Sequence, residues 1–234
     1  MSMNHRLTVA DSKFEMRGDA QLPTTLSNAV LSGCWFFACH FGMSAKSPTQ
    51  RRTIRDIRLV DCKATNNSAL GPAVVEDVDV NGLLTGGLCT VWGAVFRHVT
   101  LRGKCGRFLL NLPRPSDQRE QFMDANRTFY EAVDWALDVS QGEFEELEIR
   151  GVPARLIRRD PETQVVVTRA KVKALEQVWR GLDLAGTPWA ISLSHLAESP
   201  FDDRVLVAPK RGKEFRRWQE GLHLLQRAGV AEPS

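Results

Sequence analysis

Polar residues with acid–base potential recur at regular intervals along this sequence. Asp56, Asp77 and His98 follow one another 21 residues apart, with Asn28 before them and Glu146 after them. If the intervening segments stack on one another, the two carboxylates and the imidazole lie side by side. Neighbouring carboxylates repel each other and share a proton, which raises the pKa of one of them, and an adjacent imidazole titrates with them. Asp56, Asp77 and His98 are therefore candidate catalytic residues.

The same three residues also have a structural interpretation, which we favour. Asp and Asn at a chain bend commonly accept hydrogen bonds from nearby backbone amides. Under this interpretation Asp56, Asp77 and His98 shape a corner of the fold and form no site. The choice between the two depends on the elements that position these residues.

The candidate residues occupy the third position of an eight-residue repeat. Clear copies begin at Ile54, Val75, Phe96 and Phe144, and a degraded copy begins at Leu26. Apolar residues fall at positions 1, 4 and 6, and Gly or Asp usually falls at position 8. Positions 4 and 6 alternate with polar residues, as in a strand with one buried face, whereas position 1 is out of phase and requires a bend. Short strands repeated about every 20 to 25 residues are typical of a solenoid.

Stacking of the copies predicts which side chains become neighbours. One internal ladder comprises Ile57, Val78, Val99 and Leu147. A second comprises Leu59, Val80, Leu101 and Ile149. Position 2 forms an outer ladder in which the charge alternates, through Arg55, Glu76, Arg97 and Glu145. Opposite charges on adjacent strands attract, so the alternation supports this register.

The segment at residues 26–112, rejoined at 144–151, resembles right-handed parallel β-helices of the pentapeptide-repeat-like kind. The resemblance is carried by the repeat of apolar positions 1, 4 and 6 followed by Gly, and by the spacing of the copies. Pentapeptide-repeat proteins run in tandem fives with small residues at the central inward position, whereas these coils vary in length and carry Val, Ile or Leu. The resemblance therefore implies an architecture and no activity.

We expect a mainly β protein with α elements: a short right-handed parallel β-helix of about five coils, with a helical insertion and an α/β C-terminal cap. The N-terminal segment and first coils span residues 1–112, the insertion 113–143, the last coil 144–151 and the cap 152–234. The insertion should contain a helix with its N-cap at Ser116, continuing to about residue 140.

The region after Gly151 is expected to cap the open end of the stack, because an exposed strand edge promotes aggregation. Residues 156–157 and 165–167 predict two strands around a tight turn. Helices are expected at about 171–180 and 190–198, a strand at 204–207, and a closing helix at about 212–228.

Composition excludes some classes of partner. Thirty-one basic and 28 acidic residues give a net charge of +3, too small a bias to indicate nucleic acid or an anionic membrane. Five cysteines, an odd number, fit reduced thiols in the cytosol better than a disulfide framework. Cys34, Cys39 and His40 lie close together, but tetrahedral zinc usually takes two close pairs of ligands, so we predict no metal site and no cofactor.

Three other features have simpler structural explanations. The apolar run at 29–41 is too short to span a bilayer, and its lipobox-like end at Cys34 lacks the preceding apolar segment, so we expect a cytoplasmic protein without a membrane anchor. Trp92 could stack on a sugar or a partner, but we favour packing under a cap. The basic cluster at 210–217 is expected to be a solvated helix face and not an anion site.

The sequence contains no phosphate-binding loop, metalloprotease motif, nucleophile elbow or kinase motif. It does not single out one function or an oligomeric state. Our leading hypothesis is a non-enzymatic scaffold protein that presents a flat β-helix wall to another protein. The alternative is a carbohydrate-active enzyme that uses Asp56, Asp77 and His98, because larger β-helix enzymes that cleave acidic polysaccharides also draw catalytic groups from stacked wall positions.

Overall fold

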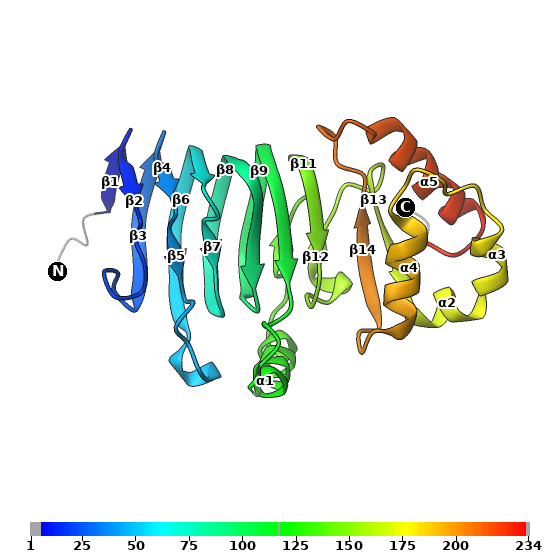
Figure 1. The fold of residues 1–234 in the computed structure, drawn as a ribbon, viewed down its shortest axis with the longest axis horizontal. Coiled ribbons are helices and arrows are strands. Elements are labelled where there is room, and N and C mark those ends of the chain that lie inside the picture. The colour runs from blue at the N-terminus through cyan, green and yellow to red at the C-terminus, as the bar shows by residue number, and fades with distance from the viewer. Residues whose placement is uncertain (1–5, 117, 233–234) are drawn as a thin grey trace.

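The computed structural model describes residues 6–116 and 118–232, which form a large, mostly parallel β-sheet at one end and a helical region at the other (Figure 1). The large sheet has twelve strands in the described part of the chain. These are β1 (Leu7–Ala10), β2 (Lys13–Glu15), β3 (Thr25–Ser32), β4 (Trp35–Phe37), β5 (His40–Phe41), β6 (Arg52–Thr65), β7 (Ala69–Leu70), β8 (Ala73–Trp92), β9 (Val95–Asn111), β10 (Leu137–Asp138), β11 (Gly142–Ile149) and β12 (Ile157–Arg158).

The remaining elements are helical or belong to a second sheet. Two short 3₁₀ helices interrupt the large sheet, η1 (Pro48–Gln50) and η2 (Ala154–Leu156). The others are α1 (Arg119–Glu131), β13 (Gln164–Thr168), α2 (Arg169–Ala174), α3 (Glu176–Arg180), α4 (Trp189–Glu198), β14 (Asp203–Val207) and α5 (Phe215–Arg227). Within the described residues, no helix combines the length and the apolar character that crossing a bilayer requires.

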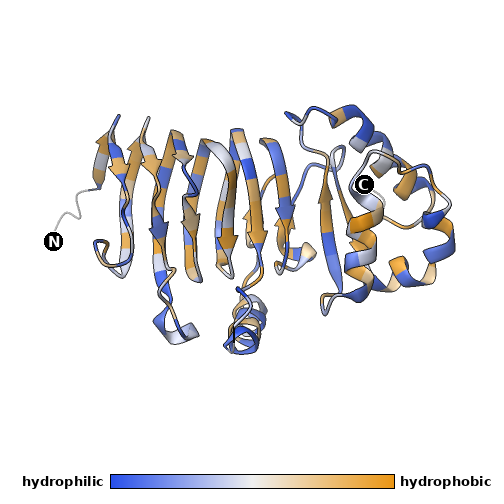
Figure 2. Ribbon diagram, in the orientation of Figure 1, coloured by the Kyte–Doolittle hydropathy of each residue, from blue (hydrophilic) through white to orange (hydrophobic). Residues whose placement is uncertain are grey.

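The first three clear copies of the repeat stack in the predicted register. Ile57 of β6 lies opposite Val78 of β8, which lies opposite Val99 of β9. Leu59, Val80 and Leu101 form the second ladder in the same way. Five of these six side chains are buried, and Leu59 packs against the same core from a partly buried position. The apolar bands that cross the strands in Figure 2 follow such ladders.

The bend that position 1 requires is present in each of these copies. Position 3 has a left-handed backbone in Asn28, Asp56, Asp77 and His98, with φ between 52° and 55°. The ladder pairing is interrupted at these residues and resumes at the next one. Position 8 has the same hand, at Gly82 with φ 81° for example, and glycine adopts this conformation without steric penalty. The repeat therefore encodes one backbone bend at position 3 and another at position 8.

The register predicted for the fourth copy of the repeat, at 144–151, is wrong. Leu147 of β11 pairs with Phe108 and not with Val99, which pairs with Leu137 of β10 instead. The reason is that the second half of β9 has its own inward residues at the same 1, 4, 6 spacing: Cys105, Phe108 and Leu110. The copy at 144–151 stacks on this second half. Ile149 consequently lies opposite Leu110 and outside the predicted ladder.

The charge ladder holds for the first copies only. Glu76 pairs with Arg97 at 2.8 Å and lies between Arg55 and Arg97 in the register. Glu145 lies on β11, outside this ladder, and is 3.1 Å from Arg211. Strands β10 and β12, which lie in the segments expected to be insertion and cap, pair with each other inside the large sheet.

The helix of the insertion is shorter than expected. It begins at Arg119, and the N-cap position is Gln118 instead of Ser116, whose backbone carbonyl accepts a hydrogen bond from the Arg119 amide. It ends at Glu131, because the apolar residues that follow leave the helix, with Val133 and Ala136 entering the core of the large sheet and Leu137 starting β10. Spacing alone could not separate these residues from the helix.

The C-terminal region contains the expected helices but pairs its strands differently. Residues 156–157 and 165–167 do not form a hairpin: β12 pairs with β10, and β13 pairs antiparallel with β14. The expected helix at 171–180 is divided into α2 and α3 at Leu175, and the closing helix α5 starts at Phe215.

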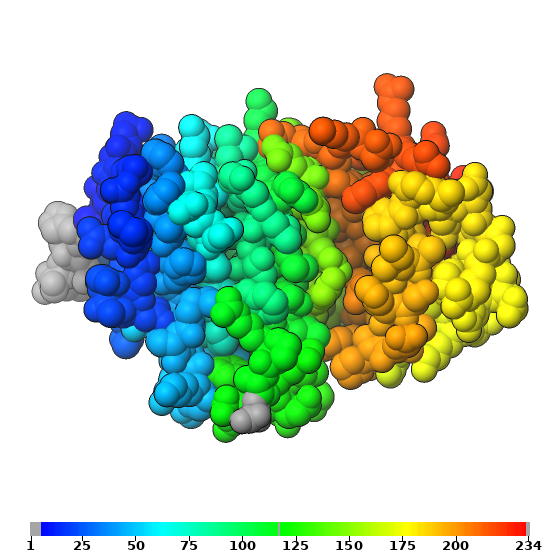
Figure 3. Space-filling model, viewed as in Figure 1, coloured from blue at the N-terminus to red at the C-terminus, as the bar shows by residue number. Residues whose placement is uncertain are grey.

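The β13–β14 sheet lies between two apolar cores. Val166, Val205 and Val207 pack into the core of the large sheet. Their neighbours Val165, Val167 and Leu206 pack into a second core with the helices. Alternate residues of a strand point to opposite faces, so this small sheet is buried on both sides. In Figure 3 the orange residues around β14 lie between the yellow-green last strands of the large sheet and the yellow helical region.

Candidate functional site

The structure brings two of the three candidate residues together and adds one more. Nδ1 of His98 lies 3.0 Å from Oδ1 of Asp77, one strand away. Nε2 of the same ring lies 2.8 Å from Oδ1 of Asp134, in the segment between α1 and β10. The result is an imidazole held between two carboxylates, which we call the histidine clamp (Asp77, His98 and Asp134).

Local folding explains the geometry of the clamp. Asp77 and His98 both have the left-handed backbone of position 3, which turns their side chains outward at the same corner. The His98 ring packs on Trp135 with the ring centroids 4.9 Å apart. On Trp135 also lies the Arg158 guanidinium, 4.1 Å from the ring centroid. The clamp thus joins the corner of β9 to the start of β10.

The electrostatics of the clamp favour a protonated imidazole. The hydrogen bond to Asp134, aided by that to Asp77, raises the pKa of His98 above its ordinary value. The same hydrogen bond lowers the pKa of Asp134. With both ring nitrogens donating to carboxylates, His98 has no nitrogen left to take a proton from a substrate until one carboxylate moves away. The arrangement is suited to holding two segments together.

The other members of the predicted column are elsewhere. Asp56 is exposed at the next corner, where its backbone carbonyl accepts a long hydrogen bond (3.5 Å) from Arg6. Glu146 is not in the column at all, because it lies on β11 and binds Arg107. The favoured idea of backbone-capping side chains does not describe Asp77 and His98, whose partners are side chains.

Asp134 is not among the predicted site residues because residues 113–143 were expected to form a helical insertion. The position of Asp134 could be inferred only by aligning Leu137 with Val99, which places Asp134 just before β10, the strand that stacks on β9. The aligned pattern is weak, because Trp135 and Ala136 replace the usual polar position 3 and its neighbour.

A second surface of interest lies on another wall of the large sheet. Trp35 of β4, Lys63 of β6 and Leu84 of β8 are direct neighbours across three strands. Trp35 and Leu84 are 36% and 37% exposed, and nearby Leu88 is 40% exposed. Phe37 lies on the same wall beside Trp35, with the two rings edge to face. We call Trp35, Phe37, Lys63, Leu84 and Leu88 the wall patch.

The aromatic part of the wall patch is held in place by polar contacts. The Trp35 indole donates a hydrogen bond of 2.6 Å to the Thr65 hydroxyl. The Lys13 ammonium lies over the Trp35 ring at 4.3 Å and over Phe37 at 5.2 Å. Such contacts reduce the conformational freedom of side chains that are partly open to solvent.

The features given structural explanations from sequence have identifiable contacts. Cys34 is buried, and its thiol is 3.5 Å from the Ser32 carbonyl oxygen. The described residues contain no group of three or more His, Cys, Asp and Glu side chains that could hold a metal ion. Trp92 packs under the Arg114 guanidinium, at 5.1 Å.

The basic cluster at 210–217 is divided among several partners. Lys210 binds Asp160 at 2.9 Å. Arg211 binds Glu145, and Arg217 donates to the Ala185 carbonyl at 2.7 Å. Since these cations point to different elements, they do not converge on one anion.

A comparison of this chain with known protein families, with curated proteins and with solved structures finds no match. Function is therefore inferred from the geometry of the chain itself.

Proposed function

We propose that this chain is a short, capped, right-handed parallel β-helix that binds another protein through the wall patch, and that it is not an enzyme. The observation that carries the binding proposal is the adjacency of Trp35, Lys63 and Leu84 on one exposed wall.

The β-helix proposal is supported by how the large sheet is paired. Strands β3, β6, β8, β9, β10 and β12 are parallel neighbours in chain order. A second parallel series runs through β5, β7, β8, β9 and β11. The two halves of β8 and of β9 belong to different series, with left-handed residues between them. Two parallel series joined by bends are expected for successive coils, and the β13–β14 sheet with its helices then covers the last coil.

The wall patch has the composition of an interface centre. Protein interfaces are enriched in aromatic residues at their buried core and have a polar rim. Large aromatic anchors such as Trp often contribute most of the binding energy. Trp35 and Phe37 would be the anchors, and Leu84 and Leu88 would extend the apolar contact.

The charge on the wall patch indicates the chemistry of the partner. The Lys63 ammonium is exposed between Trp35 and Leu84, and it makes no ion pair with the described residues. The partner is therefore a protein whose contact surface is apolar and has a carboxylate opposite Lys63. Charge complementarity of this kind increases specificity and the association rate.

The histidine clamp supports a structural role better than carbohydrate cleavage. A glycosidase needs a carboxylic acid and a carboxylate on opposite sides of a glycosidic bond. Here Asp77 and Asp134 are on opposite sides of the His98 ring, which occupies the space between them. Asp56, the third candidate, is not part of the clamp.

Site-specific photo-crosslinking in the cells that make the protein tests the binding proposal. We expect p-benzoylphenylalanine at position 84 to give an adduct with one other protein, and Lys63→Glu to abolish that adduct. The matched control is the same probe at position 191 in α4, where Ile191 is 63% exposed but far from the wall patch. Identical adducts at both positions would contradict the proposal, and an adduct only with a second copy of this chain would replace the partner by self-association.

A further inference from the structure

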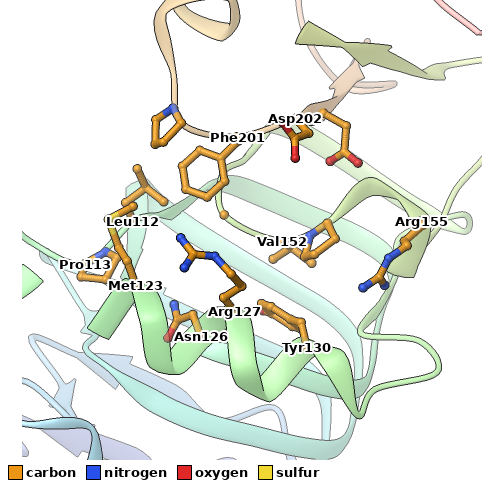
Figure 4. A pocket seen from close by; sticks show the side chains of 14 residues that line it. Leu112, Pro113, Met123, Asn126, Arg127, Tyr130, Val152, Arg155, Phe201 and Asp202 are labelled. Carbon is orange, nitrogen blue, oxygen red and sulfur yellow. The ribbon is translucent and has the colours of Figure 1, made fainter. Parts of the chain in front are cut away.

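The cavity beside α1 is lined by charged groups that already have counterparts in the chain. It measures about 300 Å³ and lies between α1 and the segments that lead into η2 and β14 (Figure 4). Figure 4 shows Arg127 and Arg155 on different sides of it. Arg127 pairs with Asp124 at 2.9 Å, and the charge of Arg155 acts on Asp203. Groups that lack a counterpart among the described residues lie elsewhere, at the open edge of the large sheet.

The first strands of the large sheet have one edge without a partner strand. β1 pairs with β3, and β2 pairs with β4, and no other described strand pairs with either of them (Figure 1). At the opposite end, the β13–β14 sheet contributes Val166, Val205 and Val207 to the core of the large sheet. An open edge presents unpaired backbone groups, which can pair with a strand of another chain.

The apolar ladders of the sheet reach this edge and stop there. Leu7 lies opposite Ala29 and so extends the ladder that contains Val78. Leu7 is 61% exposed, whereas Val78 is 6% exposed. Phe14 stacks on Phe36 with the ring centroids 5.5 Å apart, but it is only partly buried. The edge therefore exposes side chains of the kind that the sheet buries elsewhere.

The backbone groups that point out of this edge belong to Lys13 and Glu15. The carbonyl of Ser12 accepts a hydrogen bond from β4, and the amide of Met16 donates one to β4. Backbone groups of alternate residues in a strand point to opposite edges. The amides and carbonyls of Lys13 and Glu15 therefore point away from β4, toward the open side.

The side chains of the same two residues make this edge complementary to itself. Lys13 and Glu15 form an ion pair with each other, and their side chains are 44% and 49% exposed. Reversing the direction of the strand exchanges their order. In an antiparallel pair centred on Phe14, each Lys13 therefore lies opposite the Glu15 of the other strand. A pair centred on Lys13 or on Glu15 would place like charges opposite each other, which is destabilising.

We propose that β2 pairs antiparallel with β2 of a second copy of this chain, with Phe14 on the two-fold axis. The amides and carbonyls of Lys13 then bond to those of Glu15 in the second copy, and the reverse pair forms on the other side of the axis. Contact between the two ends also shields Leu7 and Phe14 from water. Charges usually protect an edge strand from pairing, but the order of these two makes the pairing specific for another copy.

Sedimentation velocity with the full chain tests this proposal. We expect a dimer, with twice the mass of one chain, at micromolar concentration. Lys13→Glu should weaken the dimer at least about tenfold, because both charge pairs across the axis become pairs of carboxylates. The matched control is Lys173→Glu, at an exposed lysine of α2 in the helical region, which should leave the dimer unchanged. A monomer at every concentration up to the millimolar range would overturn the proposal, and so would a dimer that Lys13→Glu does not weaken.

Mixing two variants separates the proposed pairing from a loss of folding. Glu15→Lys alone should weaken the dimer as Lys13→Glu does, since it places two ammonium groups opposite each other. In a mixed dimer, the two carboxylates of the Lys13→Glu chain lie opposite the two ammonium groups of the Glu15→Lys chain. The mixed dimer should therefore be at least about tenfold tighter than either variant with itself. No gain on mixing would overturn the proposed register.

The dimer is independent of the partner proposed for the wall patch. Leu84, the crosslinking position, lies on β8, three strands away from β2. A wall-patch adduct that Lys63→Glu abolishes and a dimer that Lys13→Glu weakens are separate results, so either proposal can fail while the other holds.

Discussion

The large sheet and the C-terminal helical region bury their apolar residues in different ways. In the sheet, each buried residue has counterparts of the same kind on the strands beside it, as Val78 has in Ile57 and Val99. In the helical region, the core gathers single contributions from distant segments. There the Trp189 indole donates to the Trp218 carbonyl at 2.9 Å, across 29 residues of sequence. The first core repeats along an axis, and the second has no repeat.

This difference determines which elements a destabilising substitution affects. In a stack of parallel strands each inner strand contacts two neighbours, so a defect in one ladder weakens two interfaces. A compact helical core is expected to unfold as one cooperative cluster. The two cores meet at β13–β14, where Val166 faces the sheet and Val165 faces the helices. The small sheet is therefore the element through which one region supports the other.

The largest expected effect comes from a charge placed inside a ladder. Val78 is 6% exposed and lies between Ile57 and Val99, so Val78→Asp buries an unpaired carboxylate between two strands. We expect a loss of more than about 4 kcal/mol in the free energy of unfolding, or failure to fold. Urea denaturation followed by circular dichroism measures it.

The matched control is the same change on the outside of the same strand. Leu84→Asp places its charge on the exposed wall, where it should change the free energy of unfolding by less than about 0.5 kcal/mol. Near-wild-type stability of Val78→Asp, or equal losses in both variants, would contradict the register of the ladders.

The register of these ladders was predictable because the repeat imposes it. Ile57, Val78 and Val99 share one spacing, and only one alignment buries all three. The same reasoning failed at Leu147, because the second half of β9 carries the same spacing at Cys105, Phe108 and Leu110. A period of apolar residues identifies a bent strand without saying on which segment of the sheet that strand stacks.

The contact between Asp77 and His98 was predicted from the stacking, but the C-terminal strand pairing and the third clamp residue, Asp134, could not be predicted from the sequence. The strand composition of β13 was clear, but its partner β14 comes only after three helices. No periodic pattern connects two strands so far apart. Asp134 similarly depends on where the chain returns after α1, a position set by packing. Local elements could be predicted in this region, and contacts between them could not.

The next largest loss of stability should be confined to the helical region. Leu222 of α5 is fully buried in the second core, so Leu222→Ala leaves a cavity there. Such truncations lower the free energy of unfolding by about 2–5 kcal/mol. We expect hydrogen exchange to show faster opening of the α5 amides while the β8 amides stay protected. Ile191→Ala, at an exposed site of α4, is the control and should alter neither. Equal loss of protection in β8 and α5 would mean that the two cores unfold as one.

A smaller loss in the free energy of unfolding is expected from a substitution at position 8, the bend at the end of each copy of the repeat. Gly82 has φ 81°, and a β-carbon there would lie 2.8 Å from Oδ1 of Asp61 on the strand beside it. Gly82→Ala should therefore lower the free energy of unfolding by about 1–2 kcal/mol from the left-handed backbone, with the close contact in addition. The double variant Gly82→Ala with Asp61→Ala removes that contact and, measured against Asp61→Ala alone, should recover part of the loss. No recovery would assign the whole effect to the backbone conformation.

The smallest effect is the pH dependence of the histidine clamp, which tests whether a contact outside both cores supports the sheet. Because the pKa of His98 is raised in the folded protein, the clamp's stabilisation is complete below the ordinary histidine value of about 6.5 and is lost as the pH rises through the folded value. Because the pKa of Asp134 is lowered, its share is lost as the pH falls below about 3.8.

The clamp should therefore be most effective between these two limits, and Asp134→Asn should show it. We expect this variant to lower the melting temperature more at pH 5 than at pH 9, where neutral His98 no longer needs the carboxylate. Asp124→Asn is the control: this carboxylate is paired with Arg127, which stays charged over the whole range, so its effect should not change with pH. An effect of Asp134→Asn that is the same at both pH values would show that Asp134 acts through local backbone contacts and that the imidazole contributes nothing to joining β9 to β10.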